Sequence, residues 1–131
     1  MSESTLVKLR AAVQGLIFVS ERDAPFEVFE WKTSEKLTPV AIRDLGGHPK
    51  RAKVVETEFE PFFEALTKDE SCHGAEEVEQ AVKYRELLAI FRSNLADPAI
   101  FCVGMITVTY YIVGRSSAGS WVGVKTLATE T

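Results

Sequence analysis

The sequence predicts a single α+β domain over residues 1–131, an α/β/α sandwich in which helices cover a mostly antiparallel sheet on both faces. A chain of this length is one domain's worth and can bury a core without a disulfide or a metal. The strongest observation is the last third, where Val, Ile, Thr and Tyr concentrate in residues 100–104 and 106–114 and a further run follows at 121–127. A polar turn at residues 116–119 joins the last two runs into a hairpin.

The middle run carries substantial side chains on both faces. They alternate along the strand, with Val108, Tyr110 and Ile112 on one face and Thr107, Thr109, Tyr111 and Val113 on the other. Such a strand is typical of the middle of a sheet that is covered on each side. Helices with apolar stripes precede these strands, and because they cannot bury the stripes alone, we expect them to cover the sheet. Residues 128–131 break the strand pattern and are expected to leave the sheet as a short polar tail.

The first half of the chain predicts two helices around one strand. A first helix starts at Ser2 or Ser4 and ends near Gly15, and its apolar stripe is Leu6, Leu9, Val13 and Leu16. An apolar run then meets a charged loop, and Pro25 favours an extended chain into a strand at residues 26–31. A short helix over residues 40–45 follows, with Thr38-Pro39 at its start and Gly46-Gly47 at its end.

Two further helices are predicted before the terminal strands. Residues 57–60 read as a capping box for a helix with the inward stripe Phe59, Phe62, Phe63 and Leu66. A polar connection at residues 68–74 leads to the longest helix, which ends near Asp97-Pro98. Its apolar positions recur three and four residues apart: Val78, Ala81, Tyr84, Leu88, Phe91 and Leu95.

The charge balance excludes some classes of partner. The net charge of −4 argues against direct binding of nucleic acid, which needs a concentrated basic face, and suits a basic protein partner instead. No segment has the roughly 20 apolar residues of a membrane helix, and the acidic start does not resemble a signal peptide. The two cysteines, Cys72 and Cys102, have no motif spacing. We therefore expect a reduced, cytoplasmic protein with no nucleic acid or membrane partner.

A search for catalytic or metal-binding motifs is mostly negative. The two histidines, His48 and His73, lie in expected loops without the spacing of a zinc site. Cys72 and His73 are neighbours in sequence, but nucleophile–base geometry is set in space. The basic loop around His48 is expected to be solvated surface rather than a phosphate site. The acidic run that starts at Glu76 favours the N-terminal dipole of the long helix more than a metal site.

Two polar features remain. Glu21 and Asp23 lie on a tight loop between a buried run and a strand, where a rigid scaffold can hold binding residues. The polar tail that ends in Glu130 and Thr131 follows the last strand. Periodicity alone does not say that they act together, and ordinary surface is the favoured interpretation at this point.

The sequence also resembles the nuclease A inhibitor family. The similarity is collinear over nearly the whole chain, and its motifs are residues 16–21, 25–31, 83–88, 93–95 with Pro98, 111–114, 118–119 and 130–131. The resemblance implies an α/β/α sandwich akin to that of pathogenesis-related plant proteins. It implies no enzymatic activity and no cofactor of its own.

The resemblance further implies a one-to-one inhibitor of a sugar-non-specific endonuclease of the ββα-metal type, monomeric when free. In that family a glutamate mimics the scissile phosphate and the C-terminal threonine meets the enzyme's magnesium. The matching positions here are Glu21 and Thr131, with Asp23 and Glu130 beside them. Magnesium accepts hard oxygen donors, and a carboxylate can replace a phosphate opposite basic groups.

One departure from the family pattern concerns a second contact just before the long helix. The family has an acidic–aromatic pair there, whereas this chain offers Asp69, Ser71 and Cys72 and no aromatic residue. Arg115 also stands where the pattern has an acid. The departures point to a diverged nuclease and leave two alternatives open: a same-fold binding module with a non-nuclease partner or small ligand, and a small enzyme that uses Cys72 or His73.

Overall fold

The structure, a computed structural model, describes residues 2–33, 35–67 and 74–129. The candidate residues Asp69, Ser71, Cys72, His73, Glu130 and Thr131 lie outside this part of the chain. The elements in order are α1 Ser2–Val13, β1 Ile17–Phe18, β2 Ala24–Pro25, β3 Glu27–Trp31, α2 Pro39–Leu45, β4 Val54–Thr57, α3 Phe59–Leu66, α4 Ala75–Asn94, β5 Ala96–Gly104, β6 Thr107–Arg115 and β7 Trp121–Thr129.

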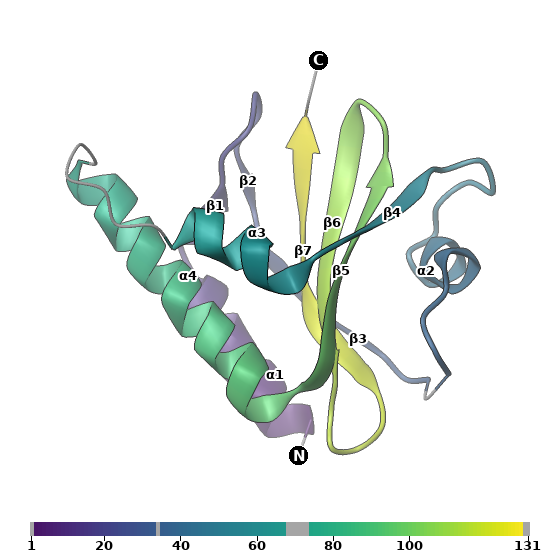
Figure 1. Ribbon diagram of the computed structural model, residues 1–131. Coiled ribbons are helices and arrows are strands. Elements are labelled where there is room, and N and C mark those ends of the chain that lie inside the picture. Colours follow the sequence, from purple (N-terminus) through teal and green to yellow (C-terminus); the bar gives the residue numbers. More distant parts are fainter. Residues whose placement is uncertain (1, 34, 68–73, 130–131) are drawn as a thin grey trace.

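Five strands form the main sheet, in the order β3-β7-β6-β5-β4, and every pair is antiparallel. The strands β1 and β2 form a separate two-stranded ribbon. Strand β7 therefore lies between β6, its neighbour in sequence, and β3 from the first third of the chain (Figure 1). This pairing joins a strand from the first third of the sequence to one from the last third within one sheet.

Helices cover both faces of the sheet, as the sequence predicts. On one face, α1 and α4 pack against each other and, with α3, enclose the larger core. Its fully buried side chains include Leu9, Leu16, Phe63, Leu87, Phe91, Ile100 and Ile112. On the other face, α2 covers the sheet (Figure 1), and Ile42 packs with Phe101, Val103, Tyr111, Val113 and Trp121. Tyr110 therefore packs against the larger core, and Tyr111 packs in the core on the α2 side of the sheet.

The short helix α2 forms as its sequence predicts. The backbone N–H of Ala41 donates to the Thr38 side-chain oxygen at 3.1 Å, and Pro39 takes the first helical position, where an N–H would have no partner. The chain turns away at Gly46 and Gly47, and Gly47 has a φ of 72°. These signals are local, and so the sequence is sufficient to locate this helix.

The expected capping box at α3 is wrong. Thr57 is the last residue of β4, and Glu58 holds the N-cap position without a side-chain cap hydrogen bond. The sequence did not predict β4 because only Val54 and Val55 are apolar within it. The strand exists because its backbone pairs with residues 100–103 of β5, a contact that local pattern does not reveal. The apolar stripe of α3 is confirmed, since Phe59 and Phe63 are buried and Phe62 and Leu66 pack beside them.

Two other boundaries differ from expectation. Strand β7 does not end at Leu127: Ala128 pairs with Val108 and Thr129 pairs with Thr107, so the polar tail begins later than predicted. In α4 the buried stripe includes Leu87, whereas Val78, expected to face inward, is 38% exposed. The helix ends at Asn94, close to its predicted end.

Candidate functional site

The β1–β2 ribbon carries the loop of Glu21 and Asp23 and is fixed to α4 at its base. The backbone N–H of Ile17 donates to the Gln80 side-chain oxygen at 2.9 Å, and the Tyr84 hydroxyl donates to the Ile17 carbonyl at 2.8 Å. Burial raises the pKa of Tyr84, so its hydroxyl remains a neutral donor at physiological pH. Both bonds hold the strand that enters the loop.

An aromatic cluster fixes the same ribbon to the sheet and to α3. The ring of Phe18 lies with its centroid 5.1 Å from that of Tyr110, 6.0 Å from that of Phe26 and 6.1 Å from that of Phe62. Aromatic rings at such separations contribute packing energy and a defined orientation. The loop after Phe18 thus starts from a rigid position.

The loop itself is hydrogen-bonded to the end of β7. The backbone N–H of Glu21 donates to the Thr129 carbonyl at 3.3 Å, and the N–H of Thr129 donates to Ser20 Oγ at 3.1 Å. The Ser20 hydroxyl also donates to the Arg22 carbonyl across the loop, at 2.8 Å. The Ser20 side chain therefore links the loop to itself and to the last strand.

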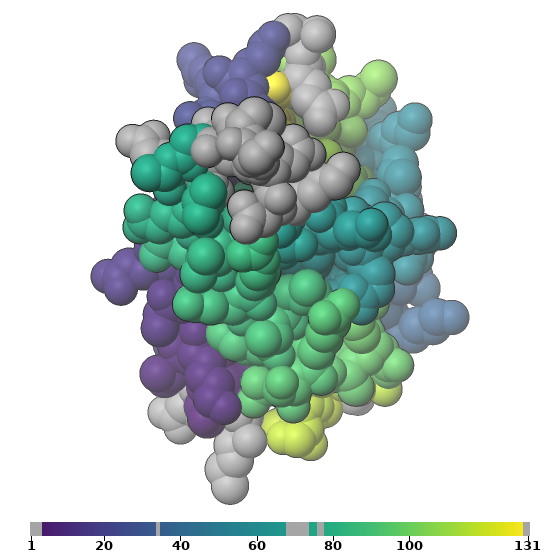
Figure 2. All heavy atoms as spheres, turned by 60° about the vertical axis from the view of Figure 1, so that its left-hand side comes forward, coloured from purple at the N-terminus to yellow at the C-terminus, as the bar shows by residue number. Residues whose placement is uncertain are grey.

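The side chains of Glu21 and Asp23 are exposed at the end of the molecule to which β7 runs. The structure brings this loop within hydrogen-bond distance of Thr129, the last residue that it describes. Figure 2 shows the loop, coloured blue-purple, protruding at the same end. Glu130 and Thr131 continue from Thr129 but lie outside the described residues, as do Asp69, Ser71 and Cys72, so their positions relative to Glu21 stay predictions.

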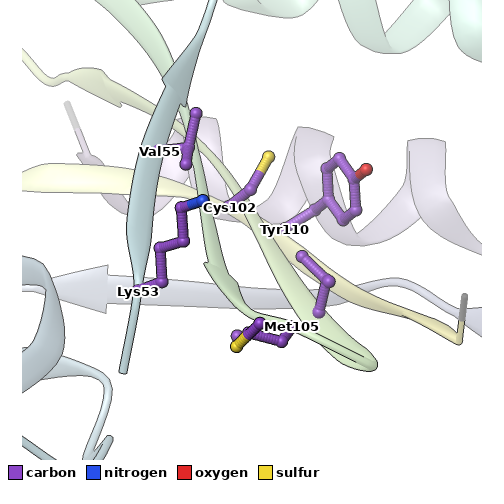
Figure 3. Close-up of a pocket in the computed structure, with 7 residues that line it drawn as sticks. Lys53, Val55, Cys102, Met105 and Tyr110 are labelled. Carbon is purple, nitrogen blue, oxygen red and sulfur yellow. The ribbon is translucent and has the colours of Figure 1, made fainter. Parts of the chain in front are cut away.

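Sequence reasoning did not identify a second feature of this end, the turn between β5 and β6. Met105 is 77% exposed and Ile106 is 64% exposed. A hollow of about 310 Å³ lies at the base of this turn. Its lining includes Lys53, Val55, Cys102, Met105 and Tyr110 (Figure 3). The turn signal in the sequence was Gly104 between two apolar runs, but Ile106 was assigned to the strand that follows.

The basic loop of residues 48–51 was expected on solvated surface, and Pro49, Lys50 and Arg51 are exposed, but His48 is half-buried. Its Nε2 lies 2.6 Å from the Tyr111 hydroxyl oxygen, within hydrogen-bond distance. Burial, with the positive charge of Lys125 as a second cause, lowers the pKa of His48, and burial raises the pKa of Tyr111. Both side chains are therefore mainly neutral near pH 7. The contact joins the loop after α2 to the middle of the sheet, which indicates a structural role.

The described part of the chain has neither a metal-binding cluster nor a membrane-spanning helix. There, no three His, Cys, Asp or Glu side chains gather closely enough to hold a metal ion. Within the same residues, none of the helices is both long enough and apolar enough to cross a bilayer. The arrangement at the exposed end offers carboxylates, backbone groups and apolar side chains on a rigid support.

The fold and this end define the class of protein as an α/β/α sandwich domain with an exposed, rigidly supported acidic loop. The family model described as "Nuclease A inhibitor-like protein" matches residues 3–131. Since the match covers nearly the whole chain, the chain belongs to the nuclease A inhibitor-like family. No curated protein matches it.

Proposed function

We propose that this chain is an inhibitor protein that binds a sugar-non-specific nuclease of the ββα-metal type and blocks its magnesium-containing active site. The observation that carries the proposal is the pair of backbone and side-chain hydrogen bonds that hold the Glu21 loop against Thr129. They bring an exposed carboxylate and the end of β7 to one end of the domain. Membership of the nuclease A inhibitor-like family supports the same function.

Glu21 occupies the place of the scissile phosphate in this proposal. A carboxylate offers two anionic oxygens, which accept charge-assisted hydrogen bonds from the basic groups that bind phosphate in a nuclease. Asp23, exposed on the same loop, adds negative charge that favours approach to a basic cleft. The loop is anchored before binding, so little conformational entropy is lost when the complex forms.

Thr131 meets the nuclease's magnesium in this proposal, and Glu130 flanks it. Magnesium prefers oxygen ligands and usually keeps several of its waters, so an incoming hydroxyl or carboxylate oxygen can replace one. The inhibitor needs no metal or cofactor of its own for this contact. Asp69, Ser71 and Cys72 supply a second contact to the same nuclease, and the complex forms one-to-one in the cytoplasm from a free monomer.

The test is a titration of the protein into a nuclease assay that uses the host's own sugar-non-specific nuclease. Wild type is compared with Glu21→Gln and with a variant lacking Thr131. Glu86→Gln is the matched control, because Glu86 is an exposed acid on α4 and its replacement removes the same charge. Removal of one partner of a buried charge pair costs about 2–5 kcal/mol, which corresponds to a rise in Kd of roughly 30-fold or more.

The control is expected to inhibit as wild type does. Equal inhibition by all four proteins would show that Glu21 and Thr131 are not the contacts. Absence of inhibition by wild type would remove the proposed function itself. A pull-down that recovers a different basic protein would then favour a binding module with another partner.

A further inference from the structure

The turn between β5 and β6 contradicts the usual chemistry of turns. Gly, Pro, Asn, Asp and Ser dominate tight turns, because they tolerate the backbone geometry or bond to it. Here the turn positions are Met105 and Ile106, and both are more than 60% exposed. Single exposed apolar residues are ordinary. Two adjacent large apolar residues at the tip of a hairpin depart from the residue preferences of turns, and such departures often occur at binding sites.

The hairpin holds this turn in one position. Gly104, with a φ of 119°, pairs with Val108, and a Cβ at this glycine would lie 2.3 Å from the Thr107 carbonyl oxygen. The N–H of Gly104 also donates to the Lys53 carbonyl at 2.9 Å, which ties the turn to the chain entering β4. Because the turn is already ordered, contact through its side chains loses less entropy than contact through a flexible loop.

The turn lies at the same end of the molecule as the Glu21 loop. Thr107, directly after the turn, pairs with Thr129, and the Thr129 carbonyl accepts from the N–H of Glu21. The end of β7 thus has the acidic loop on one side and the apolar turn on the other (Figure 1). Figure 2 also shows both protruding at this end, the loop in blue-purple and the turn in light green.

We propose that Met105 and Ile106 form an apolar anchor by which this end docks on the surface of the same nuclease, beside its metal site. The inference rests on the proposed function and adds a contact on the opposite side of β7 from Glu21. Affinity in protein interfaces concentrates in a few well-packed anchors next to polar contacts. The unbranched thioether of Met105 can adjust to an irregular surface. The hollow of about 310 Å³ at its base leaves room for a side chain of the nuclease (Figure 3).

The test measures Kd and dissociation rate for the full chain on the immobilised sugar-non-specific nuclease of the host. The main variant is Met105→Ser/Ile106→Ser, and Met105→Gln is a second variant of nearly unchanged shape. The matched control is Val7→Ser/Val40→Ser, since both valines are 59% exposed and lie on α1 and α2. The main variant is expected to bind about 10- to 100-fold more weakly, chiefly through faster dissociation, and the control to bind as wild type.

Amide hydrogen exchange of the wild-type protein at residues 104–107 gives a second readout that needs no variant. Slower exchange in the presence of the nuclease is expected. Unchanged binding by the serine variant, together with weaker binding by Glu21→Gln, would overturn the anchor and leave the proposed function intact. A wild-type protein that does not bind the nuclease would overturn both. Sedimentation that shows a dimer lost only in the serine variant, with nuclease binding unchanged, would assign the turn to self-association and overturn the anchor.

Discussion

Ser20 is the side chain that joins the Glu21 loop to β7, and Ser20→Ala tests whether this link positions the carboxylate. The substitution removes the hydrogen bond from the Thr129 N–H, 3.1 Å long, and the bond to the Arg22 carbonyl, 2.8 Å long. A typical intramolecular hydrogen bond contributes about 0.5–1.5 kcal/mol net. The bond to the Arg22 carbonyl is exposed and water replaces it readily. We therefore expect a loss of about 1 kcal/mol in the free energy of unfolding.

This loss corresponds to a measurable decrease in the melting temperature, Tm. The entropy of unfolding is about 2.1 cal/mol/K per residue, and the chain has 131 residues. A loss of about 1 kcal/mol therefore lowers Tm by about 4 °C. The loosened loop must also be ordered on binding, so we expect the Kd for the nuclease to rise by about 3- to 10-fold.

Calorimetry and the nuclease titration measure the two effects. Ser117→Ala is the control, because Ser117 is exposed in the turn before β7 and its hydroxyl makes no hydrogen bond among the described residues. If Ser20→Ala has the same Tm as this control and inhibits as wild type does, then the Ser20 link does not position the loop. A lower Tm with unchanged inhibition would show that the link stabilises the fold only.

Three further predictions concern the scaffold. Phe63→Ala removes a fully buried ring and should lower the free energy of unfolding, measured by chemical denaturation, by about 3–5 kcal/mol. The exposed-site control Ser117→Ala should change it little. Gly104→Ala should destabilise the fold far more than Gly47→Ala, and thermal melting compares the two variants directly. Both glycines have a positive φ, but of the two only Gly104 would place the new Cβ in a clash with the backbone. Because the pKa of His48 is lowered in the folded protein, the unfolded chain binds more protons than the folded one near pH 6. The free energy of unfolding should therefore fall as the pH drops through about 6.5, and it should fall less steeply in His48→Gln. Equal slopes of unfolding free energy against pH would assign the pH dependence to other groups.

The parts of the fold that the sequence predicted well are those with local signals. The alternation through Tyr110, Tyr111 and Ile112 identified a strand covered on both faces, and two cores confirm it. The Thr38-Pro39 start of α2 and the apolar stripe of α3 are likewise local, and both are confirmed.

The parts that the sequence missed depend on partners distant in the chain. Strand β4 is held by pairing with β5, and the last residues of β7 look polar but pair with the start of β6. His48 contacts Tyr111, 63 residues away, and no spacing rule indicates such a contact. In each case the stabilising group becomes visible only when the sheet order is known.

The candidate site divides in the same way. The tight loop after a buried run was expected from Glu21, Asp23 and Pro25, but the link between this loop and Thr129 required the pairing of β3 with β7. The roles of Glu21 and Thr131 came from the family resemblance and stay predictions. The turn of Met105 and Ile106 was missed because its apolar side chains continue the pattern of the strands on either side.

The order of the sheet has a consequence for synthesis of the chain. Among the described strands, β7 is the last to leave the ribosome, yet it occupies an interior position next to β3. Until β7 arrives, β3 has no partner in the main sheet, and the loop of Glu21 lacks the strand that holds it. Pairings between distant segments form slowly because a long loop must close first. A nascent chain therefore has no assembled binding end before β7 is made, and, under the proposed function, inhibition should appear only in chains that contain β7.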